Sequence, residues 1–358
     1  MQNFQFLRNV FCTFAIACAS EPKCIDFQPL IMKRLILLIA TALMVLNVSA
    51  AEIEKKTYTF ATNGGVDLYL DYYSASEEEQ PCLIFVFGGA FLTGSRAEPE
   101  QISVYEYFVE QGWKVAAIDY RLGLKPLVDE PNVDRNILDI RRMLIDAVDV
   151  ATEDLLSATA YLVRNAKSLA INPKQIVVLG SSAGAITACQ AEYAISNSWD
   201  VARRLPANFN YAGIISMAGA IMDDGRQLEW AKEPCPIMMF HGNSDTNVPY
   251  EKISLLGTRM FGSKVIAESL QQMGAPYWFY AANNVGHSLS WKPMYFQRDD
   301  MLEFANRMAF GGEKMHYFEW VDDLSLEQQR HDFKLTDFIK ANFAPSVEHT
   351  AESAAELN

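Results

Sequence analysis

Residues 176–187 read Ile-Val-Val-Leu-Gly-Ser-Ser-Ala-Gly-Ala-Ile-Thr. The apolar run 176–179 is typical of a strand that is buried on both faces of a parallel sheet, and the stretch after Gly184 is compatible with a helix. Between them lies a Gly-x-Ser-x-Gly turn, whose small residues let the chain reverse sharply and expose the hydroxyl of Ser182. The following helix directs free N–H groups to the same place, which favours a developing negative charge. The stretch indicates a nucleophilic serine, although the pentapeptide by itself also fits a glycine-rich turn with an ordinary serine.

Strands and helices alternate on both sides of this turn. Segments 57–62 and 66–73 are rich in aromatic and β-branched residues, and the Asn63-Gly64-Gly65 turn between them predicts an antiparallel hairpin. Further buried strands are predicted by short apolar runs at 82–87, 113–118, 175–179, 211–218, 236–240 and 276–281. The alternation predicts an α/β fold with a mostly parallel eight-stranded sheet, helices on both faces and the N-terminal hairpin.

Three helices can be placed from their patterns. Apolar residues at helical spacing occur at 155–169 and at 265–273, and Gly274 is a suitable C-terminal cap for the second. Ser325 followed by Gln328 resembles a capping box and predicts the start of the last helix.

The N-terminal part of the chain is interpreted as a targeting segment. Residues 32–50 combine Lys33-Arg34, a twelve-residue apolar run and a Val-Ser-Ala ending, the layout of a secretory signal peptide. The run is too short for a transmembrane helix, and no cysteine stands directly after the expected cleavage site to carry a lipid, so no stable membrane anchor is expected. We interpret residues 1–31 as an upstream extension from a mis-assigned start. The sequence thus predicts an exported protein, periplasmic or secreted, with a domain at 51–345 and a polar tail at 346–358.

Composition restricts the partners of this protein. Half of its 358 residues are hydrophobic and 21% are charged, which is typical of a folded globular protein. The net charge is −14, which argues against nucleic acid or an anionic membrane as a partner, because both are bound through positive patches. After residue 50 three cysteines remain, Cys82, Cys189 and Cys235, and we expect them to be buried free thiols.

A serine hydroxyl needs a base and an acid behind it to become a nucleophile. Asp245 follows the predicted strand 236–240, and His287 follows the next one, 276–281. Because parallel strands end at one edge of the sheet, these loops should converge on the Ser182 turn. The sequence therefore predicts a catalytic triad of Ser182, Asp245 and His287.

Other candidates for the base and the acid are weaker. His241 is close to Asp245 along the chain, and we expect it to support the turn; His316, His331 and His349 lie in the C-terminal region and are expected to be structural or exposed. Asp223 and Asp224 remain alternatives for the acid, one strand too early for the expected order.

A loop after another strand can supply hydrogen-bond donors for an oxyanion. It reads Phe87-Gly88-Gly89-Ala90-Phe91, and Asp119-Tyr120-Arg121 follows the next strand. With the triad order Ser, Asp, His, the chain resembles the α/β-hydrolase superfamily, in particular its esterase/lipase (carboxylesterase-like) group, over about residues 57–345. The resemblance implies an oxyanion hole formed by the N–H groups of Gly89, Ala90 and Ala183.

The chain departs from the pattern of that group at two positions. Phe87 replaces the first histidine of the usual His-Gly-Gly-Gly loop, and Ala90 replaces its last glycine. The N–H donors can persist, because every residue except proline carries one. The resemblance also implies that Arg121 is structural and paired with an acid.

The resemblance implies a serine carboxylic-ester hydrolase that works through an acyl-enzyme and needs no metal, nucleotide or flavin cofactor. The expected substrate is a small-molecule or carbohydrate ester with a short acyl or acetyl group. Segments 122–150 and 288–321 are long enough to form caps over the site. Four aromatic side chains in or near them are candidates for an acyl or sugar pocket: Trp291, Tyr295, Phe296 and Trp320.

Two other functions stay open at this point. One is a serine exopeptidase of the same superfamily, which would need an acidic cluster for the substrate amine. The other is a catalytically silent binding protein with a hydrolase-like fold. A complete triad argues against the second, because a binding protein gains nothing from keeping three catalytic groups in register.

Overall fold

The computed structural model describes residues 52–129 and 136–343 of the chain. The segments interpreted as an upstream extension (1–31), a signal peptide (32–50) and a polar tail (346–358) lie outside the described residues. Glu52 onward forms one compact unit, and the account below concerns that unit.

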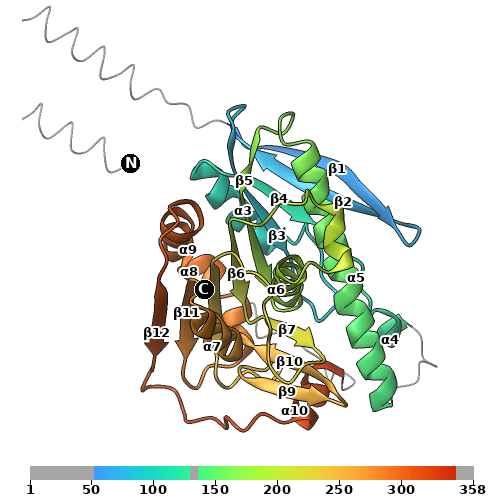
Figure 1. Cartoon of the computed structure of the whole chain (residues 1–358), viewed down its shortest axis with the longest axis vertical. Helices are drawn as coiled ribbons and strands as arrows, with labels where there is room; N and C mark the ends of the chain where they lie inside the picture. Colours follow the sequence, from blue (N-terminus) through green and yellow to red (C-terminus); the bar gives the residue numbers. More distant parts are fainter. Residues whose placement is uncertain (1–51, 130–135, 344–358) are drawn as a thin grey trace, which may run out of the picture. The chain divides into compact units, whose positions relative to one another are not determined.

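A nine-stranded sheet forms the centre of the unit (Figure 1). In spatial order its strands are β1 (Glu54–Asn63), β2 (Val66–Ser74), β4 (Lys114–Ile118), β3 (Gln80–Val86), β5 (Ile171–Ser181), β6 (Gly213–Met217), β8 (Ile237–Gly242), β11 (Tyr277–Ala282) and β12 (His316–Val321). β2 pairs antiparallel with β1 and with β4, and all later neighbours pair in parallel. The eight strands predicted from the sequence are all present, and the structure adds β12 at one edge.

The turn of the β1–β2 hairpin lies at two glycines. Asn63 pairs with Val66, so Gly64 and Gly65 alone form the turn, with φ values of 56° and 79°. Positive φ at both central residues gives the turn whose twist matches a β-hairpin, and glycine adopts it without a steric penalty.

Helices cover both faces of the sheet, as predicted. The helical segments are α3 (Pro99–Glu110), α4 (Pro126–Asp129), α5 (Ile137–Arg164), α6 (Ala183–Ser196), η1 (Asp200–Arg204), α7 (Ser263–Met273), η2 (His287–Ser290), α8 (Pro293–Phe296), α9 (Arg298–Phe304), η3 (Ala305–Phe310) and α10 (Leu335–Phe343). α5, α6 and α7 pack on one face (Figure 1). α3 and the α9–η3 segment pack on the other, where the Tyr107 hydroxyl donates to Asp299 and Trp113 contacts Phe310. The central strands are therefore buried on both sides.

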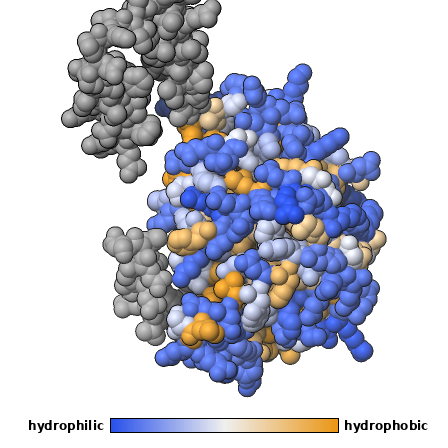
Figure 2. Space-filling model, turned by 90° about the vertical axis from the view of Figure 1, so that its left-hand side faces the viewer, coloured by the Kyte–Doolittle hydropathy of each residue, from blue (hydrophilic) through white to orange (hydrophobic). Residues whose placement is uncertain are grey.

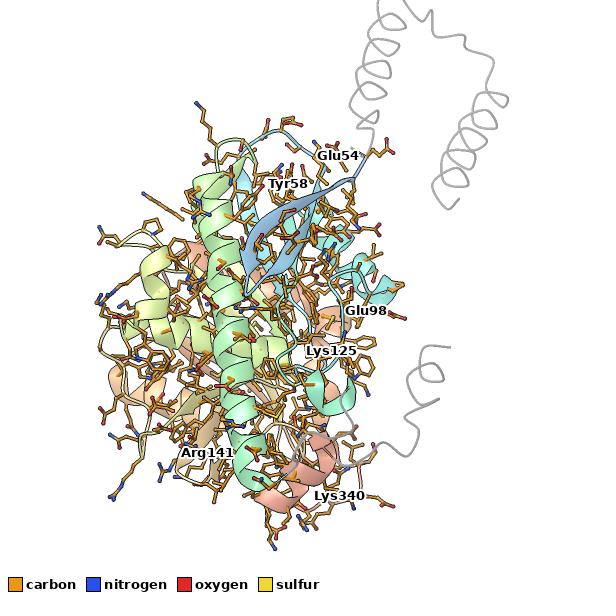
Figure 3. All side chains as sticks on the ribbon, turned by 90° about the vertical axis from the view of Figure 1, so that its right-hand side faces the viewer. Glu54, Tyr58, Glu98, Lys125, Arg141 and Lys340 are labelled. Atoms are coloured by element: carbon orange, nitrogen blue, oxygen red, sulfur yellow. The ribbon has the colours of Figure 1, made fainter. Side chains whose placement is uncertain are left out.

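The two long segments after strands β4 and β11 build parts of the scaffold. In segment 122–150, Asn136 caps α5 by accepting hydrogen bonds from the amides of Leu138 and Asp139 at 3.0 Å, and the helix continues to Arg164. Figure 3 shows α5 running beside β1 and β2, with Arg141 near one end. Arg141 donates to the Leu255 carbonyl and to the Thr258 hydroxyl, which joins α5 to a second, three-stranded sheet.

That second sheet was not expected from the sequence. It has the order β7 (Ala220–Asp223), β10 (Thr258–Gly262) and β9 (Lys252–Leu255), all antiparallel. Its strands are four or five residues long, too short to show a clear alternation of polar and apolar residues.

Segment 288–321 ends in the edge strand β12. Side chains of β12 are partly exposed, including Phe318 at 55% and Trp320 at 47%. Figure 2 views the molecule from the side on which β12 lies in Figure 1, and there hydrophobic residues form separate patches among hydrophilic ones. The last helix, α10, begins at Leu335 and not near Ser325, because Ser325 binds the Asp323 carboxylate through both its amide and its hydroxyl, as a turn residue does.

Cys82, Cys189 and Cys235 carry free thiols and are buried, as the sequence predicts. β5 and β6 separate the strand of Cys82 from β8, which begins two residues after Cys235. Among the described residues, no helix is both long and apolar enough to cross a bilayer.

Glu192 is a fully buried carboxyl group in α6. Its Oε1 accepts hydrogen bonds from the Cys235 amide at 2.9 Å, the Ser196 hydroxyl at 3.1 Å and the Asn210 amide at 3.2 Å. Burial nevertheless disfavours the charged form more than these donors favour it, and raises the pKa of Glu192 to about 7.

We therefore expect Glu192→Gln to flatten the fall in stability between pH 4.5 and 7. The folded state holds the Glu192 proton more tightly than the unfolded chain does. Glu192 therefore stabilises the folded protein fully at pH values below its pKa in the unfolded chain. This stabilisation, about 3 kcal/mol, is lost as the pH rises through the pKa of Glu192 in the folded protein. Urea unfolding of both proteins at several pH values measures the difference. Glu110→Gln, at an exposed position, is the matched control, and its stability should depend on pH as that of the wild type does.

Candidate active site

Ser182 occupies the sharp turn between β5 and α6. Its backbone has φ 50° and ψ −115°, a conformation that non-glycine residues rarely adopt. Two hydrogen bonds hold the turn: the Ser182 amide donates to the Met217 carbonyl at 2.8 Å, and the Ile186 amide donates to the Ser182 carbonyl at 2.9 Å. With the backbone in this conformation, the Ser182 side chain reaches His287.

Both glycines of the pentapeptide are required by close backbone approach. A Cβ atom at Gly180 would lie 2.4 Å from the Gly184 carbonyl oxygen, and one at Gly184 would lie 2.1 Å from the Val86 carbonyl oxygen. Real Cβ atoms do not come so close to backbone. The glycines therefore let the start of α6 pack directly against the ends of β5 and β3.

The structure brings Ser182, His287 and Asp245 together. Ser182 Oγ lies 2.9 Å from His287 Nε2, and His287 Nδ1 lies 2.7 Å from Asp245 Oδ2. They follow β5, β11 and β8, whose carboxyl ends meet at one edge of the sheet. The His287 side chain is 25% exposed, whereas that of Asp245 is fully buried. The site thus contains a partly exposed base, a partly exposed serine and an acid that is screened from water.

The buried Asp245 carboxylate is held in its charged form. Burial opposes ionisation, but the nearby charge of His287 and hydrogen bonds from His241 and His287 outweigh it, so the pKa of Asp245 lies below its ordinary value. The other carboxylate oxygen, Oδ1, accepts from the amides of Asn247 at 2.8 Å and Val248 at 3.0 Å. These contacts fix the orientation of the carboxylate toward His287.

The Phe87–Phe91 loop lies against the serine. A Cβ atom at Gly88 would be 3.3 Å from Ser182 Cβ. Gly89, Ala90 and Phe91 have φ values of 117°, 54° and 58°, and the Gly89 carbonyl accepts from the amides of Leu92 and Thr93, which closes the loop into a turn.

The implied oxyanion donors are unpaired in this turn. Among the described residues, no hydrogen-bond acceptor faces the amides of Gly89, Ala90 or Ala183. Ala183 is the first residue of α6, where amides have no partner within the helix. Within the described part of the chain, the three N–H groups therefore have no protein acceptor that a ligand oxygen would have to displace.

Phe87 has a structural partner that accounts for the departure from histidine. Its ring stacks on Tyr120 with centroids 4.4 Å apart, and the Tyr120 hydroxyl donates to the Phe87 carbonyl at 3.0 Å. Arg121, the next residue, binds the buried Asp154 carboxylate through Nε and Nη2 and also pairs with Glu153. The expected pairing of Arg121 with an acid is therefore confirmed.

The alternative acids and bases have other partners. Asp223 accepts from the Gly225 amide, and Asp224 accepts from the Thr258 hydroxyl in the small sheet. His331 Nε2 contacts Asn284 Oδ1 at 3.0 Å, and His316 stacks on Tyr277. His349 lies outside the described residues.

The aromatic candidates for a substrate pocket are scattered. Tyr295 contacts Trp291 and donates to the Glu100 carbonyl, which joins α8 to α3. Phe296 is 67% exposed, and Trp320 stacks on Phe318 in β12.

Sequence reasoning missed the asparagines that join the acid loop to the base loop. Asn243 Oδ1 accepts from the Asn284 amide at 2.8 Å, and Asn243 Nδ2 donates to Asn283 Oδ1 at 2.8 Å. The Ser244 amide donates to the Val285 carbonyl at 3.0 Å. An asparagine just after each of two neighbouring strands was the available signal, because such side chains commonly bond to loop backbone.

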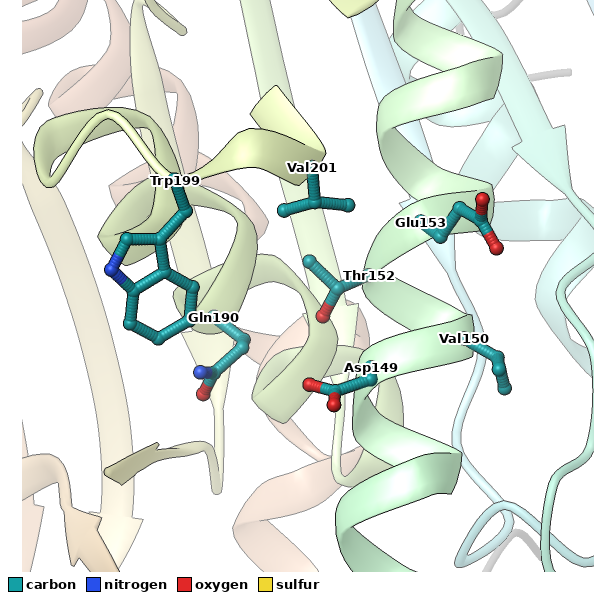
Figure 4. Close-up of a pocket in the computed structure, with 7 residues that line it drawn as sticks. All are labelled: Asp149, Val150, Thr152, Glu153, Gln190, Trp199 and Val201. Carbon is teal, nitrogen blue, oxygen red and sulfur yellow. The ribbon is translucent and has the colours of Figure 1, made fainter. Parts of the chain in front are cut away.

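A cavity of about 350 Å³ lies elsewhere, between α5, α6 and η1 (Figure 4). It is lined by Asp149, Val150, Thr152, Glu153, Gln190, Trp199 and Val201, and by none of the three triad residues. Over residues 52–129 and 136–343, no cluster of three or more His, Cys, Asp or Glu side chains could hold a metal ion.

Comparison with known proteins supports the topology. Residues 66–145 match the family model described as BD-FAE. Esterase 2 from the Planctomycetes species Thermogutta terrifontis, phosphorylated by paraoxon, matches with a TM-score of 0.50 and 19% identity over 72% of this chain and 94% of that protein. Its apo form matches with a TM-score of 0.50 and 19% identity over 74% and 96%. MGS-M1, an α/β hydrolase enzyme from a Medee basin deep-sea metagenome library, matches with a TM-score of 0.48 and 16% identity over 73% and 99%.

Proposed function

We propose that this chain, which has the α/β-hydrolase fold, is a serine carboxylic-ester hydrolase with Ser182 as its nucleophile. The observation that carries the proposal is the continuous chain of contacts from Ser182 Oγ through the His287 ring to Asp245 Oδ2, at 2.9 Å and 2.7 Å. The ionised Asp245 carboxylate can only accept a hydrogen bond, so His287 Nδ1 must carry a proton, which leaves Nε2 as the acceptor for the serine proton.

The reaction takes place in two halves. His287 Nε2 removes the proton of Ser182 as Oγ attacks the ester carbonyl carbon, and the protonated His287 then gives that proton to the leaving alcohol oxygen. A water molecule, deprotonated by His287, then attacks the carbonyl carbon of the acyl-enzyme. The bond from that carbon to Ser182 Oγ breaks as His287 returns the proton to Oγ, which releases the carboxylic acid and regenerates Ser182 and neutral His287. Asp245 keeps the imidazole in the required tautomer and stabilises its charged form.

The oxyanion of each tetrahedral intermediate would be bound by the amides of Gly89, Ala90 and Ala183. Their unpaired state supports this role, since preorganised donors need no rearrangement as the charge develops. The dipole of the fourteen-residue helix α6 adds to the same stabilisation.

The proposed substrates are esters of acetic acid or other short carboxylic acids, including esters in which the alcohol is a carbohydrate. The test is a screen of the purified protein against 4-nitrophenyl acetate, butyrate and longer esters, beside aminoacyl and dipeptidyl anilides. Hydrolysis of the short esters supports the proposal. Hydrolysis of the anilides alone would identify an exopeptidase, and no turnover of either set would identify a binding protein.

We also propose that the protein is exported, on the three-part layout of residues 32–50. We expect the protein recovered from the periplasm or medium of the expressing cell to begin at Ala51, with Glu52 as the neighbouring alternative. N-terminal sequencing of that material measures this. Recovery of the chain only from the cell interior with residues 32–50 attached would contradict the export proposal.

A further inference from the structure

His241 is a second imidazole at the acid of the triad. It lies in β8, four residues before Asp245, and it is fully buried. Its Nδ1 is 2.8 Å from Ser263 Oγ, and its Nε2 is 3.2 Å from the Val248 carbonyl oxygen and 3.3 Å from Asp245 Oδ2. The same Asp245 oxygen is 2.7 Å from His287 Nδ1. Asp245 Oδ2 is therefore shared by two imidazole rings, one of which also contacts Ser182.

The neighbours of His241 determine which ring nitrogen carries the proton. A carbonyl oxygen can only accept, and the ionised Asp245 carboxylate can only accept as well. Nε2 faces both, so Nε2 is the donor. On the other side of the ring, Nδ1 lies 2.8 Å from Ser263 Oγ, whose hydroxyl also donates to the Gly219 carbonyl at 3.4 Å. His241 Nε2–H is thus a hydrogen-bond donor to the Asp245 carboxylate.

We infer that His241 is a positioning residue that acts through Asp245: its Nε2–H holds Asp245 Oδ2 in the orientation that receives His287 Nδ1–H and draws negative charge from that oxygen. The inference rests on the proposed function and adds a residue to that site. The backbone amides of Asn247 and Val248 hold only Oδ1, so His241 is the contact besides His287 that orients Oδ2.

Loss of this donor should have two effects. The carboxylate is less well fixed, so the imidazole is less often in register with Ser182 and kcat falls. Asp245 Oδ2 also carries more negative charge, which stabilises the protonated form of His287. Because the reaction needs neutral His287, the acidic limb of the pH profile of kcat/KM moves to higher pH.

Few charged groups face the pair of His241 and Asp245. The titratable side chains in contact with His241 are Asp245 and Tyr250, whose ring lies edge-on at 5.7 Å. Asp245 in turn contacts His287. Beside Ser263 and Tyr250, Lys264 and Glu251 pair with each other at 2.6 Å. Variants at position 241 leave all of these groups in place.

The test compares His241→Asn with His241→Gln in the full chain, using 4-nitrophenyl acetate over a range of pH. The asparagine amide can replace Nδ1 toward Ser263 but does not reach Asp245, whereas the longer glutamine amide places a donor near the position of Nε2. We expect the asparagine variant to lose about tenfold or more in kcat with little change in KM, and its acidic limb to rise by about half a pH unit. In the glutamine variant, both kcat and the position of the acidic limb should be close to those of the wild type.

A purely structural role of His241 would not shift the acidic limb of the pH profile. Tyr250→Phe, which keeps the ring packed on His241, is the control and should leave the profile unchanged. Far-UV circular dichroism and titration of Ser182 with a phosphonate count the folded sites in each variant; if the asparagine variant does not fold, His241→Leu replaces it. The inference is overturned if the folded asparagine or leucine variant keeps the acidic limb of the wild type. It is also overturned if the glutamine variant folds but has no higher kcat and no lower acidic limb than the asparagine variant. A wild-type protein that reacts with neither ester nor phosphonate overturns the proposed function itself.

Discussion

Ser182→Ala should abolish ester turnover without unfolding the protein. Removal of Oγ leaves no nucleophile for an acyl-enzyme, and the loss in related triads is about 10⁴- to 10⁶-fold in kcat. Alanine fits the space of serine, and the hydrogen bonds that hold the turn come from the backbone of Ser182 and not from its side chain. Steady-state kinetics with 4-nitrophenyl acetate, together with a thermal unfolding curve, measure both parts of the expectation.

Ser181→Ala is the matched control for this substitution. Ser181 is the last residue of β5 and is 7% exposed, and its hydroxyl faces the Gly88 backbone beside the loop. Because it does not contact His287, the variant should keep most of the activity. A serine-directed phosphonate should label the Ser182 peptide in mass spectrometry. An adduct on another residue, or full activity in both variants, would show that the nucleophile is misassigned.

His287→Ala should lower kcat by several orders of magnitude, because no other base lies within reach of Ser182 Oγ among the described residues. Asp245→Asn should lower it by about 10⁴-fold. The asparagine amide would donate to His287 Nδ1 and so favour the tautomer with the proton on Nε2, which cannot accept the proton of Ser182. Single-turnover measurements at saturating substrate would place the loss in the acylation step.

Asp223→Asn and Asp224→Asn test the alternative acids. Their carboxylates bond to the Gly225 amide and to Thr258, near the small sheet, so we expect both variants to stay within a few-fold of the wild type. An Asp245→Asn variant that keeps its activity while one of these loses it would transfer the acid to the end of β7.

The strands that carry the triad could be predicted from the sequence because they are buried on both faces. A continuous apolar run such as 176–179 has no other stable location in a soluble domain, and the loop after it is then placed at the end of the sheet. β12 has no such signal: its aromatic side chains are partly exposed at an edge, and the same composition fits a cap. β7, β9 and β10 are too short for periodicity to identify them.

Helix boundaries were less predictable for a related reason. The apolar pattern locates the buried part of α5 near Leu155, but its first half was assigned to a long connection. Asn136 with Asp139 was an available capping signal, whereas Ser325 with Gln328 was a misleading one. Capping pairs are local and weak, and tertiary contacts decide which of them is used.

The sequence by itself determined the chemical groups of the site and their order, because a strand–turn–helix with Gly180, Ser182 and Gly184 is sterically restricted to a sharp elbow. The tertiary structure decided the distances among those groups and the partners behind them. Ser182, Asp245 and His287 meet only because β5, β6, β8 and β11 pair side by side, and pairing over many residues of separation is a property of the whole sheet. The contact of His241 with Asp245, the stacking of Phe87 on Tyr120 and the asparagine links between loops arise in the same way. Each depends on side-chain packing between segments that are distant or differently folded, which no local pattern encodes.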